Sequence, residues 1–238
     1  QDTRTAASRE FLLPGVVALS LLAAGFLGGF ARIDQWGLDR LLALHASART
    51  MPADIVVIDI DQKSLEDMNE VAGSWPWPRA VHAELIDALA QQQPKAIVFD
   101  LLLNEADTFR ADSDALFAGI VAGTSQVYLP TMLMSNGNGA RLADFPPALR
   151  IEKTPAAQPG ARAPLLLPLI VPPDSCRGCT INFLADSDGV GRRYALHTDV
   201  SGWRVPSMPH RVAQDLAWPM PSGEDYVLNW YGTQAQRH

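Results

Sequence analysis

The stretch Ile55–Asp107, IVVIDIDQKSLEDMNEVAGSWPWPRAVHAELIDALAQQQPKAIVFDLLLNEAD, decides the fold class of this chain. Its apolar, β-branched run IVVID returns downstream as AIVFD, and such runs are typical of strands buried on both faces. The segment RAVHAELIDALAQQQ between them places apolar residues on one helical stripe and is closed by Pro94. A strand, a crossover helix and a second strand normally form parallel neighbours. We therefore predict an α/β fold in which a mixed sheet with a βαβ core is flanked by helices.

Carboxylates follow both predicted strands. Asp59 and Asp61 end the first strand and Asp100 ends the second, at the edge where open α/β sheets usually bind ligands. Three interpretations of the first pair stay open. Asp61 with Ser64 can cap a helix that begins near Lys63, or the pair can contact a ligand or ion. The pair also fits the D-x-D pattern of haloacid dehalogenase-type phosphotransferases. Such an enzyme also needs a phosphate-binding lysine and a downstream acidic metal pair, and we do not find these in the sequence.

The motif WPWPR, residues 75–79, stands directly before the predicted crossover helix. Its prolines fix an extended entry and its tryptophans fill space between loop and sheet. Arg79 lies at the helix start, where the helix dipole disfavours a cation, so we expect a carboxylate partner. The candidates are Asp59, Asp61 and Asp100, and His82, one turn along, could join the network. The cluster is either a structural clamp or a site for a small anionic or polar ligand. Its candidate ligand-binding residues are Asp59, Asp61, Trp77, Arg79, His82 and Asp100.

Composition limits the function classes. With 238 residues and 47% hydrophobic content, the chain has room for one large domain with a substantial core, or for such a domain plus an anchor. The net charge of -7 argues against a nucleic-acid surface, which needs clustered Lys and Arg. We expect no metal site, no other cofactor and no catalytic residue in the chain.

The N-terminal region predicts a membrane anchor. A polar tail, residues 1–10, precedes Phe11–Ala31, which contains no charged residue and is long enough to span a bilayer. A buried core helix and a cleaved signal peptide are the alternatives. Gly25 and Gly29 have the small-residue spacing that lets membrane helices, including those of a homodimer, pack closely. Residues 32–52 are predicted to continue as an amphipathic connector helix, and residues 53–238 as the main domain.

Weaker signals describe the rest of the chain. We expect a helix over residues 113–124, a strand over 126–130, and irregular loops with one short helix over 130–173, where half of the 18 prolines fall. Residues 181–197 read as a hairpin around a DSDG turn, in which Asp186 and Asp188 serve turn chemistry rather than cation binding. A final helix in VPSMPHRVAQDLA and a last strand in EDYVLNWYG complete the domain.

Cys176 and Cys179 are the only cysteines, within the loop-rich region. A metal site would need further ligands nearby, and a thioredoxin-like site would need the pair at a helix start. In an oxidising compartment we predict a small disulfide between them, although free or intermolecularly paired cysteines stay possible.

Two groups of motifs resemble the type-2 CHASE domain, a sensory extracellular module associated with bacterial cyclases and histidine kinases. The first consists of DIDQKSL, WPWPR, HAELIDALA and AIVFDLLLNEAD, and the second of INFLADSDGVGRRYALH followed by VPSM. The resemblance covers roughly Asp54 to Trp230, with a variable middle. WPWPR before a helix is its specific element, whereas DSDG alone is a weak signal.

The resemblance implies a membrane-anchored sensory domain on the periplasmic or outer side of a bacterial inner membrane. Such a domain binds a small ligand or a partner protein and shifts the packing of its transmembrane helices. Members of the family usually continue into further helices and a cytoplasmic output domain, whereas this sequence stops at His238. The alternatives are a structural or accessory subunit of a membrane complex and, less favoured, a phosphatase-like enzyme.

Overall fold

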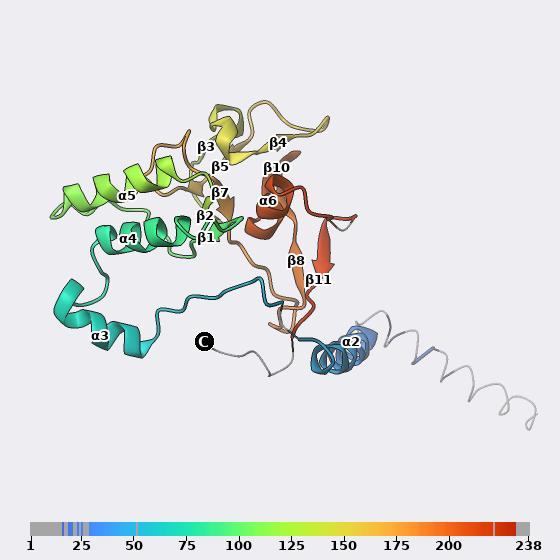
Figure 1. The fold of residues 1–238 in the computed structure, drawn as a ribbon. Coiled ribbons are helices and arrows are strands. Elements are labelled where there is room, and N and C mark those ends of the chain that lie inside the picture. The colour runs from blue at the N-terminus through green and yellow to red at the C-terminus, as the bar shows by residue number, and fades with distance from the viewer. Residues whose placement is uncertain are drawn as a thin grey trace, which may run out of the picture. The chain divides into compact units, whose positions relative to one another are not determined.

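The computed structural model describes residues 29–50, 52–220 and 222–231, together with Val16, Leu19, Ser20, Ala23 and Gly25 (Figure 1). The chain divides into two compact units. One comprises Gln1–Val57 with Asn229–His238, and the other Ile58–Leu228.

The first unit contains helix α2, Gly29–Ser47, which confirms the helix predicted for the connector. Several of its apolar side chains are exposed, and the guanidinium of Arg40 lies 5.5 Å from the centre of the Trp36 ring. The predicted span Phe11–Ala31 lies largely outside the described residues. Gly25 and Gly29 are described, and the packing of another helix against them stays a prediction. Among the residues that are described, no helix is both long and apolar enough to cross a membrane.

The first predicted strand does not form. Residues 55–60 are irregular, and the side chains from Ile55 to Ile58 are 51–80% exposed. A strand must pair its backbone N–H and C=O groups with a neighbour, and within the described ranges no strand pairs with this run. The run also crosses the boundary between the two units, so it links them rather than lying inside a sheet.

The observed βαβ unit lies one element further along the chain. Strand β1 (Ile97–Val98) is followed by helix α5 (Ala111–Gly123) and strand β2 (Val127–Leu133), and β1 pairs with β2 in parallel. Strand β7 (Gly178–Thr180) pairs with β2 in parallel and β6 (Leu165–Leu166) pairs with it antiparallel. The mixed sheet of an α/β fold is therefore confirmed, with β2 as the strand that all the others join.

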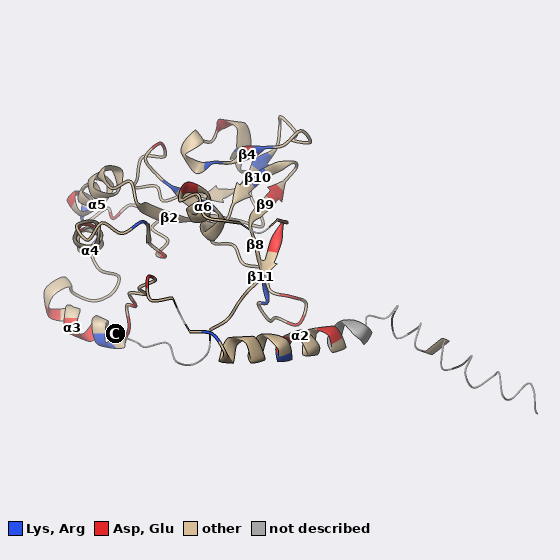
Figure 2. Ribbon diagram, turned by 45° about the vertical axis from the view of Figure 1, so that its right-hand side comes forward, with Lys and Arg blue, Asp and Glu red and all other residues tan. Residues whose placement is uncertain are grey.

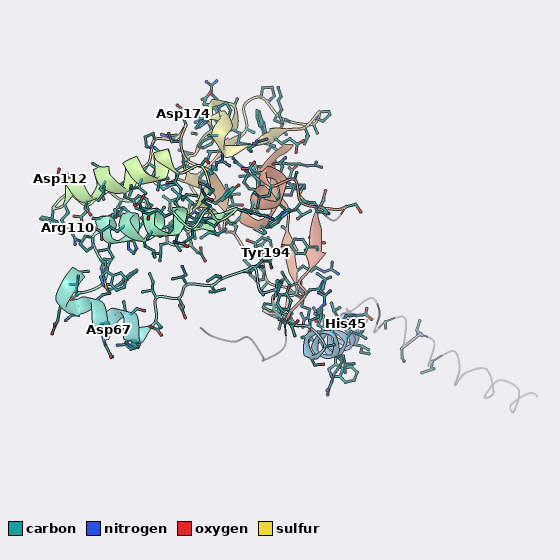
Figure 3. All side chains as sticks on the ribbon, in the orientation of Figure 1. His45, Asp67, Arg110, Asp112, Asp174 and Tyr194 are labelled. Carbon is teal, nitrogen blue, oxygen red and sulfur yellow. The ribbon has the colours of Figure 1, made fainter. Side chains whose placement is uncertain are left out.

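Helices α3 (Gln62–Ala72) and α4 (Arg79–Ala90) precede this sheet. Helix α4 follows Pro78 and buries His82, Ala83 and Ile86 on one stripe, as the sequence pattern predicts. Helices α4 and α5 pack side by side (Figures 1 and 2), and the space around them is filled with side chains (Figure 3). The core formed there consists of Ala83, Ile86, Ile97, Phe99, Phe117, Val121, Val127, Leu129, Val171 and Cys176.

Short elements make up the remainder of the second unit. The region 130–173 is mostly irregular, as predicted, with two turns of 3-10 helix in place of the expected short helix: η1 (Leu142–Asp144) and η2 (Pro147–Leu149). Helix α6 (Met208–Asp215) and strand β11 (Asp225–Val227) confirm the predicted last helix and last strand. Strands β3 (Ala140–Arg141) and β5 (Arg162–Ala163) form a two-stranded sheet. A three-stranded sheet consists of β4 (Glu152–Lys153), β10 (Trp203–Pro206) and β9 (His197–Val200), in that order.

The predicted hairpin over 181–197 forms only its turn. The Gly189 N–H donates to the Asp186 carbonyl at 2.8 Å, but residues 181–184 are not a strand, and β8 (Arg193–Ala195) pairs with β11 instead. The Phe183 ring lies against Gly191, where an added Cβ would collide with it.

The DSDG turn binds a guanidinium of its own chain. Arg192 is 2% exposed and donates to Asp186 at 3.0 Å and to both carboxylate oxygens of Asp188 at 2.9 and 2.8 Å. The hydrogen bonds from Arg192 lower the pKa of Asp188 to about 2. A buried guanidinium needs such partners, so the two carboxylates hold the turn to the domain.

Replacing Arg192 tests this ion pair, and its neighbour provides the control. Arg192→Gln should lower the free energy of unfolding by about 3 kcal/mol, because it removes several charge-assisted hydrogen bonds. Arg193→Gln should change it by less than about 1 kcal/mol, because Arg193 pairs with Asp225 at the surface. Urea unfolding measures both, and equal losses in the two variants would contradict the assignment.

Candidate functional site

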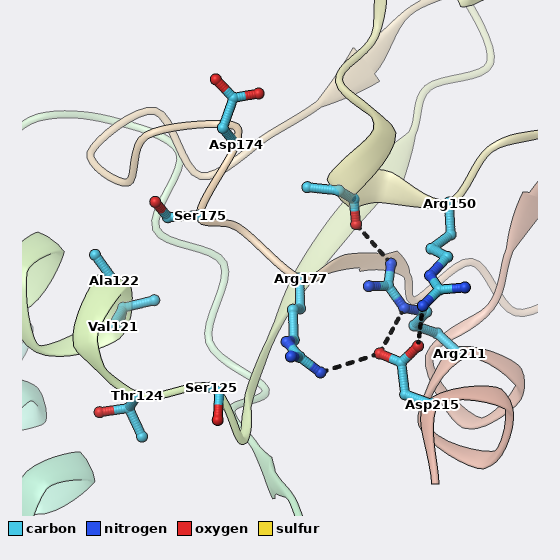
Figure 4. Close-up of a pocket in the computed structure, with 11 residues that line it drawn as sticks. Val121, Ala122, Thr124, Ser125, Arg150, Asp174, Ser175, Arg177, Arg211 and Asp215 are labelled. Atoms are coloured by element: carbon cyan, nitrogen blue, oxygen red, sulfur yellow. Dashed lines mark hydrogen bonds and ion pairs between the residues drawn. The ribbon is translucent and has the colours of Figure 1, made fainter. Parts of the chain in front are cut away.

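A cavity of about 550 Å³ opens in the second unit. Its volume lies within the range of small-molecule sites in proteins, about 300–1,000 Å³. The walls come from the end of α5, from η2 and the residue after it, from the loop before β7, and from α6 (Figure 4). The lining residues are Val121, Ala122, Thr124, Ser125, Ala148, Arg150, Asp174, Ser175, Arg177, Arg211 and Asp215.

Three arginines converge on one carboxylate at this cavity (Figure 4). The Oδ2 of Asp215 accepts from Arg211 Nε at 2.9 Å and from Arg177 Nη1 at 3.2 Å. Its Oδ1 lies 3.4 Å from Arg150 Nη2. One negative charge thus faces three positive charges, which leaves the cluster two positive charges in excess.

Burial divides the arginine cluster into an inner and an outer part. The side chains of Arg211 and Asp215 are 4% and 6% exposed, whereas those of Arg150 and Arg177 are 55% and 36% exposed. Arg211 and Asp215 are four residues apart on α6, and Arg211 also donates to the Ala148 carbonyl at 2.7 Å. The inner pair is therefore structural, and the outer arginines are accessible from the cavity.

The backbone positions the two outer arginines. Arg150 ends η2 in the left-handed region, with φ of 54°, which costs a residue with a Cβ about 1 kcal/mol. Arg177 precedes β7, and its guanidinium lies 5.7 Å from the centre of the Tyr128 ring on β2. The Tyr128 hydroxyl donates to Asp215 at 3.2 Å and accepts from Arg177 at 3.4 Å. Burial raises the pKa of Tyr128, so its hydroxyl stays protonated at neutral pH.

The opposite wall has different chemistry. Val121, Ala122, Thr124 and Ser125 come from the C-terminal end of α5, across the cavity from Asp215 (Figure 4). Thr124 and Ser125 bring hydroxyl groups to this wall, and the Thr124 hydroxyl donates to the Ile120 carbonyl at 2.7 Å. The Asp174 carboxylate is directed away from Asp215 (Figure 4). The cavity thus combines a cationic end with a polar end that accepts hydrogen bonds.

Sequence reasoning missed this site. The spacing of Arg211 and Asp215 on the predicted last helix is a local signal for an ion pair. Arg150 and Arg177 lie in the loop-rich part of the chain, and nothing in the sequence links them to that helix.

The structure does not bring the six predicted ligand-binding residues together as one site. The Asp61 carboxylate accepts from the Ser64 N–H at 2.8 Å and from its hydroxyl at 2.9 Å, which confirms the helix-cap interpretation. The Ser64 N–H bond lowers the pKa of Asp61. Asp59 lies exposed in the irregular segment, and Asp100 lies exposed after β1.

Arg79 has carboxylate partners, but not those predicted. Its Nε lies 3.2 Å from Asp114 and its Nη1 4.0 Å from Asp107, and it also donates to the Glu105 carbonyl. The expected partners Asp59, Asp61 and Asp100 are thus replaced by residues at the start of α5, where Figure 3 also shows Arg110 and Asp112. The reason is the packing of α5 along α4, which brings its first turn beside Arg79.

Trp77 and His82 belong to an aromatic cluster. The His82 ring lies 5.9 Å from that of Trp75, 6.1 Å from that of Trp77 and 5.6 Å from that of Phe99. His82 and Trp77 are buried. These contacts support the interpretation of WPWPR as a structural clamp.

Cys176 and Cys179 are both free and buried, so the predicted disulfide is not formed in this structure. Their side chains enter different hydrophobic clusters. Cys176 packs with the core between α4 and the sheet, and Cys179 packs with Tyr128, Met208 and Val212. Burial raises the pKa of the two thiols to about 11 and about 12 respectively.

His82 should make stability depend on pH. Burial, and then the charge of Arg79, lower its pKa from the ordinary 6.5, so the folded state keeps the ring neutral where the unfolded chain takes up a proton. Stability should therefore fall as pH drops below about 6.5, until the lowered pKa is passed. His82→Phe should reduce the difference between urea midpoints at pH 8 and pH 5, whereas His45→Phe, on exposed α2, should leave it unchanged. An unchanged difference in His82→Phe would contradict this assignment.

Comparisons with known proteins place the chain in a family. No curated protein and no solved structure matches it significantly. The sequence profile of the CHASE2 domain matches residues 16–237, which is nearly the whole chain. The match includes both groups of motifs around WPWPR and DSDG, and the mixed α/β unit that they form. This chain therefore belongs to the CHASE2 domain family, a family of extracellular sensory domains.

Proposed function

We propose that this CHASE2 domain is the ligand-sensing part of a membrane-anchored bacterial signal-transduction receptor. In this proposal the α/β unit lies outside the cytoplasm, Phe11–Ala31 anchors it in the inner membrane, and catalysis belongs to other parts of the receptor. The observation that carries the proposal is the cavity at the arginine cluster. A sensory domain needs a place where a stimulus is bound, and this cavity has the size and the accessible charged groups of such a place.

The position of the cavity also suggests how binding is transmitted. Arg211 and Asp215 lie on α6, and a short segment connects α6 to β11. After β11 the chain enters the segment Asn229–His238, which belongs to the other unit. A ligand that binds two arrangements of α6 with different affinity would shift the equilibrium between them and thereby act on the segment that leaves the domain.

Two observations support a role without catalysis in this chain. A phosphatase of the D-x-D type needs Asp59 and Asp61 together at one site, but Asp61 accepts both hydrogen bonds from Ser64 as a helix cap. The cysteines are buried thiols with raised pKa values, whereas a nucleophilic cysteine needs a lowered one.

Filling the cavity tests the proposal. Ala122 lines the cavity near the end of α5, and Ala115 is an exposed residue of the same helix outside the lining. A library of small bacterial metabolites, screened for shifts in melting temperature, should contain compounds that stabilise the native domain. Ala122→Trp should abolish these shifts because the indole occupies the space, and Ala115→Trp should keep them.

Two results would count against ligand sensing at this cavity. If shifts persist in Ala122→Trp, the ligand binds elsewhere. If no compound binds, and the purified membrane complex contains a stable partner protein on this domain, the accessory-subunit interpretation replaces the sensor.

A further inference from the structure

We propose that the cavity binds a small organic anion, whose carboxylate or phosphate group is held by Arg150 and Arg177. The inference deepens the proposed sensing function and rests on it, since it names the chemical class of the ligand. In the absence of that ligand, Asp215 accepts hydrogen bonds from some of the N–H donors of the same guanidinium groups.

The arginine cluster carries more positive than negative charge. Asp215 balances one of three guanidinium groups, and Arg211, the most buried of them, is its closest partner at 2.9 Å. The two outer arginines are held less closely, at 3.2 and 3.4 Å. An anion at Arg150 and Arg177 therefore meets two cations that Asp215 does not neutralise, and Asp174, which also lines the cavity, is directed away from Asp215 (Figure 4). Since these groups lie partly out of water, the attraction is screened less than on an open surface.

The outer arginines have unused hydrogen-bonding capacity. A guanidinium has five N–H donors in a planar fork that matches a carboxylate or a phosphate. The bonds from Arg177 to Asp215 and to Tyr128 both use Nη1, and no other described residue accepts from its remaining N–H groups, so these can bind an incoming oxygen. Arg150 approaches Asp215 through Nη2, and its side chain is 55% exposed. Both arginines can therefore bind a second anion while they keep part of their contact with Asp215.

The backbone of Arg150 is left-handed. This conformation is uncommon for a residue with a Cβ, and such conformations are concentrated at functional sites. Here it occurs where η2 ends, at the residue whose own side chain reaches the cluster. A stability requirement alone would favour glycine or asparagine at this position.

The size of the cavity indicates that the ligand is more than an inorganic ion. A volume of about 550 Å³ extends from the arginines to the end of α5. Away from the arginines, the lining residues Ser125, Ser175 and Asp174 offer hydroxyl and carboxylate oxygens that can accept hydrogen bonds, and the negative charge of Asp174 disfavours a second anionic group. The ligand therefore carries its anionic group at one end and hydroxyl groups toward the other, as phosphorylated sugars and hydroxy acids do.

Isothermal titration at constant ionic strength tests the inference with glucose 6-phosphate, gluconate and inorganic phosphate, and with glucose as the neutral control. Both organic anions represent the proposed class, and at least one should bind more tightly than inorganic phosphate, while glucose should not bind. Arg177→Gln and Arg150→Asn, in which asparagine tolerates the left-handed backbone, should each weaken this binding about tenfold or more. Arg141→Gln, at an exposed arginine paired with Asp144 away from the cavity, should leave it unchanged.

Asp215→Asn provides an independent measurement. It removes the internal competitor, so the affinity for the organic anion should rise, while the variant without ligand should melt at a lower temperature because Arg211 has lost its partner. Addition of the anion should recover part of that loss. If this variant does not fold, the arginine variants still decide the question.

The outcomes separate the inference from the proposed function. Binding of neither organic anion, or binding that is equal in Arg177→Gln and in the native domain, overturns the anion site. If neutral compounds of the library bind the native domain but do not bind Ala122→Trp, sensing at the cavity stands and only the ligand class is wrong. If an anion binds with the expected dependence on Arg177 but does not change the output of the receptor, the anion site stands and the sensing function falls.

Discussion

The requirement to hydrogen-bond a buried strand organises the second unit of this protein. The first five residues of β2, Val127–Thr131, are buried, and a buried backbone group without a partner is costly. Strand β1 pairs with Val127 and Tyr128, and β7 pairs with Leu129–Thr131, both in parallel, while β6 pairs antiparallel with the two residues that follow, Met132 and Leu133. Each of these strands places the chain next to it close to β2, and the loop before β7 carries Arg177. The sheet thereby places residues together that are far apart in the sequence.

Helix α6 is short, yet it contributes residues both to the arginine cluster and to a hydrophobic cluster. It has only 8 residues, too few to be stable alone in water, so its stability comes from the contacts of its buried stripe. This stripe carries Arg211 and Asp215 to the arginine cluster, and it also packs Met208 and Val212 with Tyr128 and Cys179, next to a second, apolar cavity of about 520 Å³. Tyr128 belongs to both sets of contacts, because its hydroxyl donates to Asp215. A change in the ion pair therefore affects the apolar contacts.

Local signals in the sequence predict much of this fold. Asp61 with Ser64 predicts the start of α3, Pro78 and the apolar stripe predict α4, and the run QVYLP predicts β2. The run IVVID fails as a prediction because strand formation depends on a neighbour that the run itself does not determine. The partners of Arg79 fail for the same reason, because they depend on how α5 packs on α4. The arginine cluster joins residues 150, 177 and 211 with no shared motif, so only the folded chain reveals it.

The burial of the two cysteines affects how the domain can be studied. At neutral pH a thiol with a pKa of about 11 is a thiolate in roughly one molecule in ten thousand, and the thiolate is the form that reacts with maleimides. Both side chains are also nearly inaccessible, at 2% and 1% exposure. A cysteine introduced at the surface of this domain would therefore react far faster than either native one. Spin labels or fluorophores can be attached at chosen positions while the native Cys176 and Cys179 stay in place.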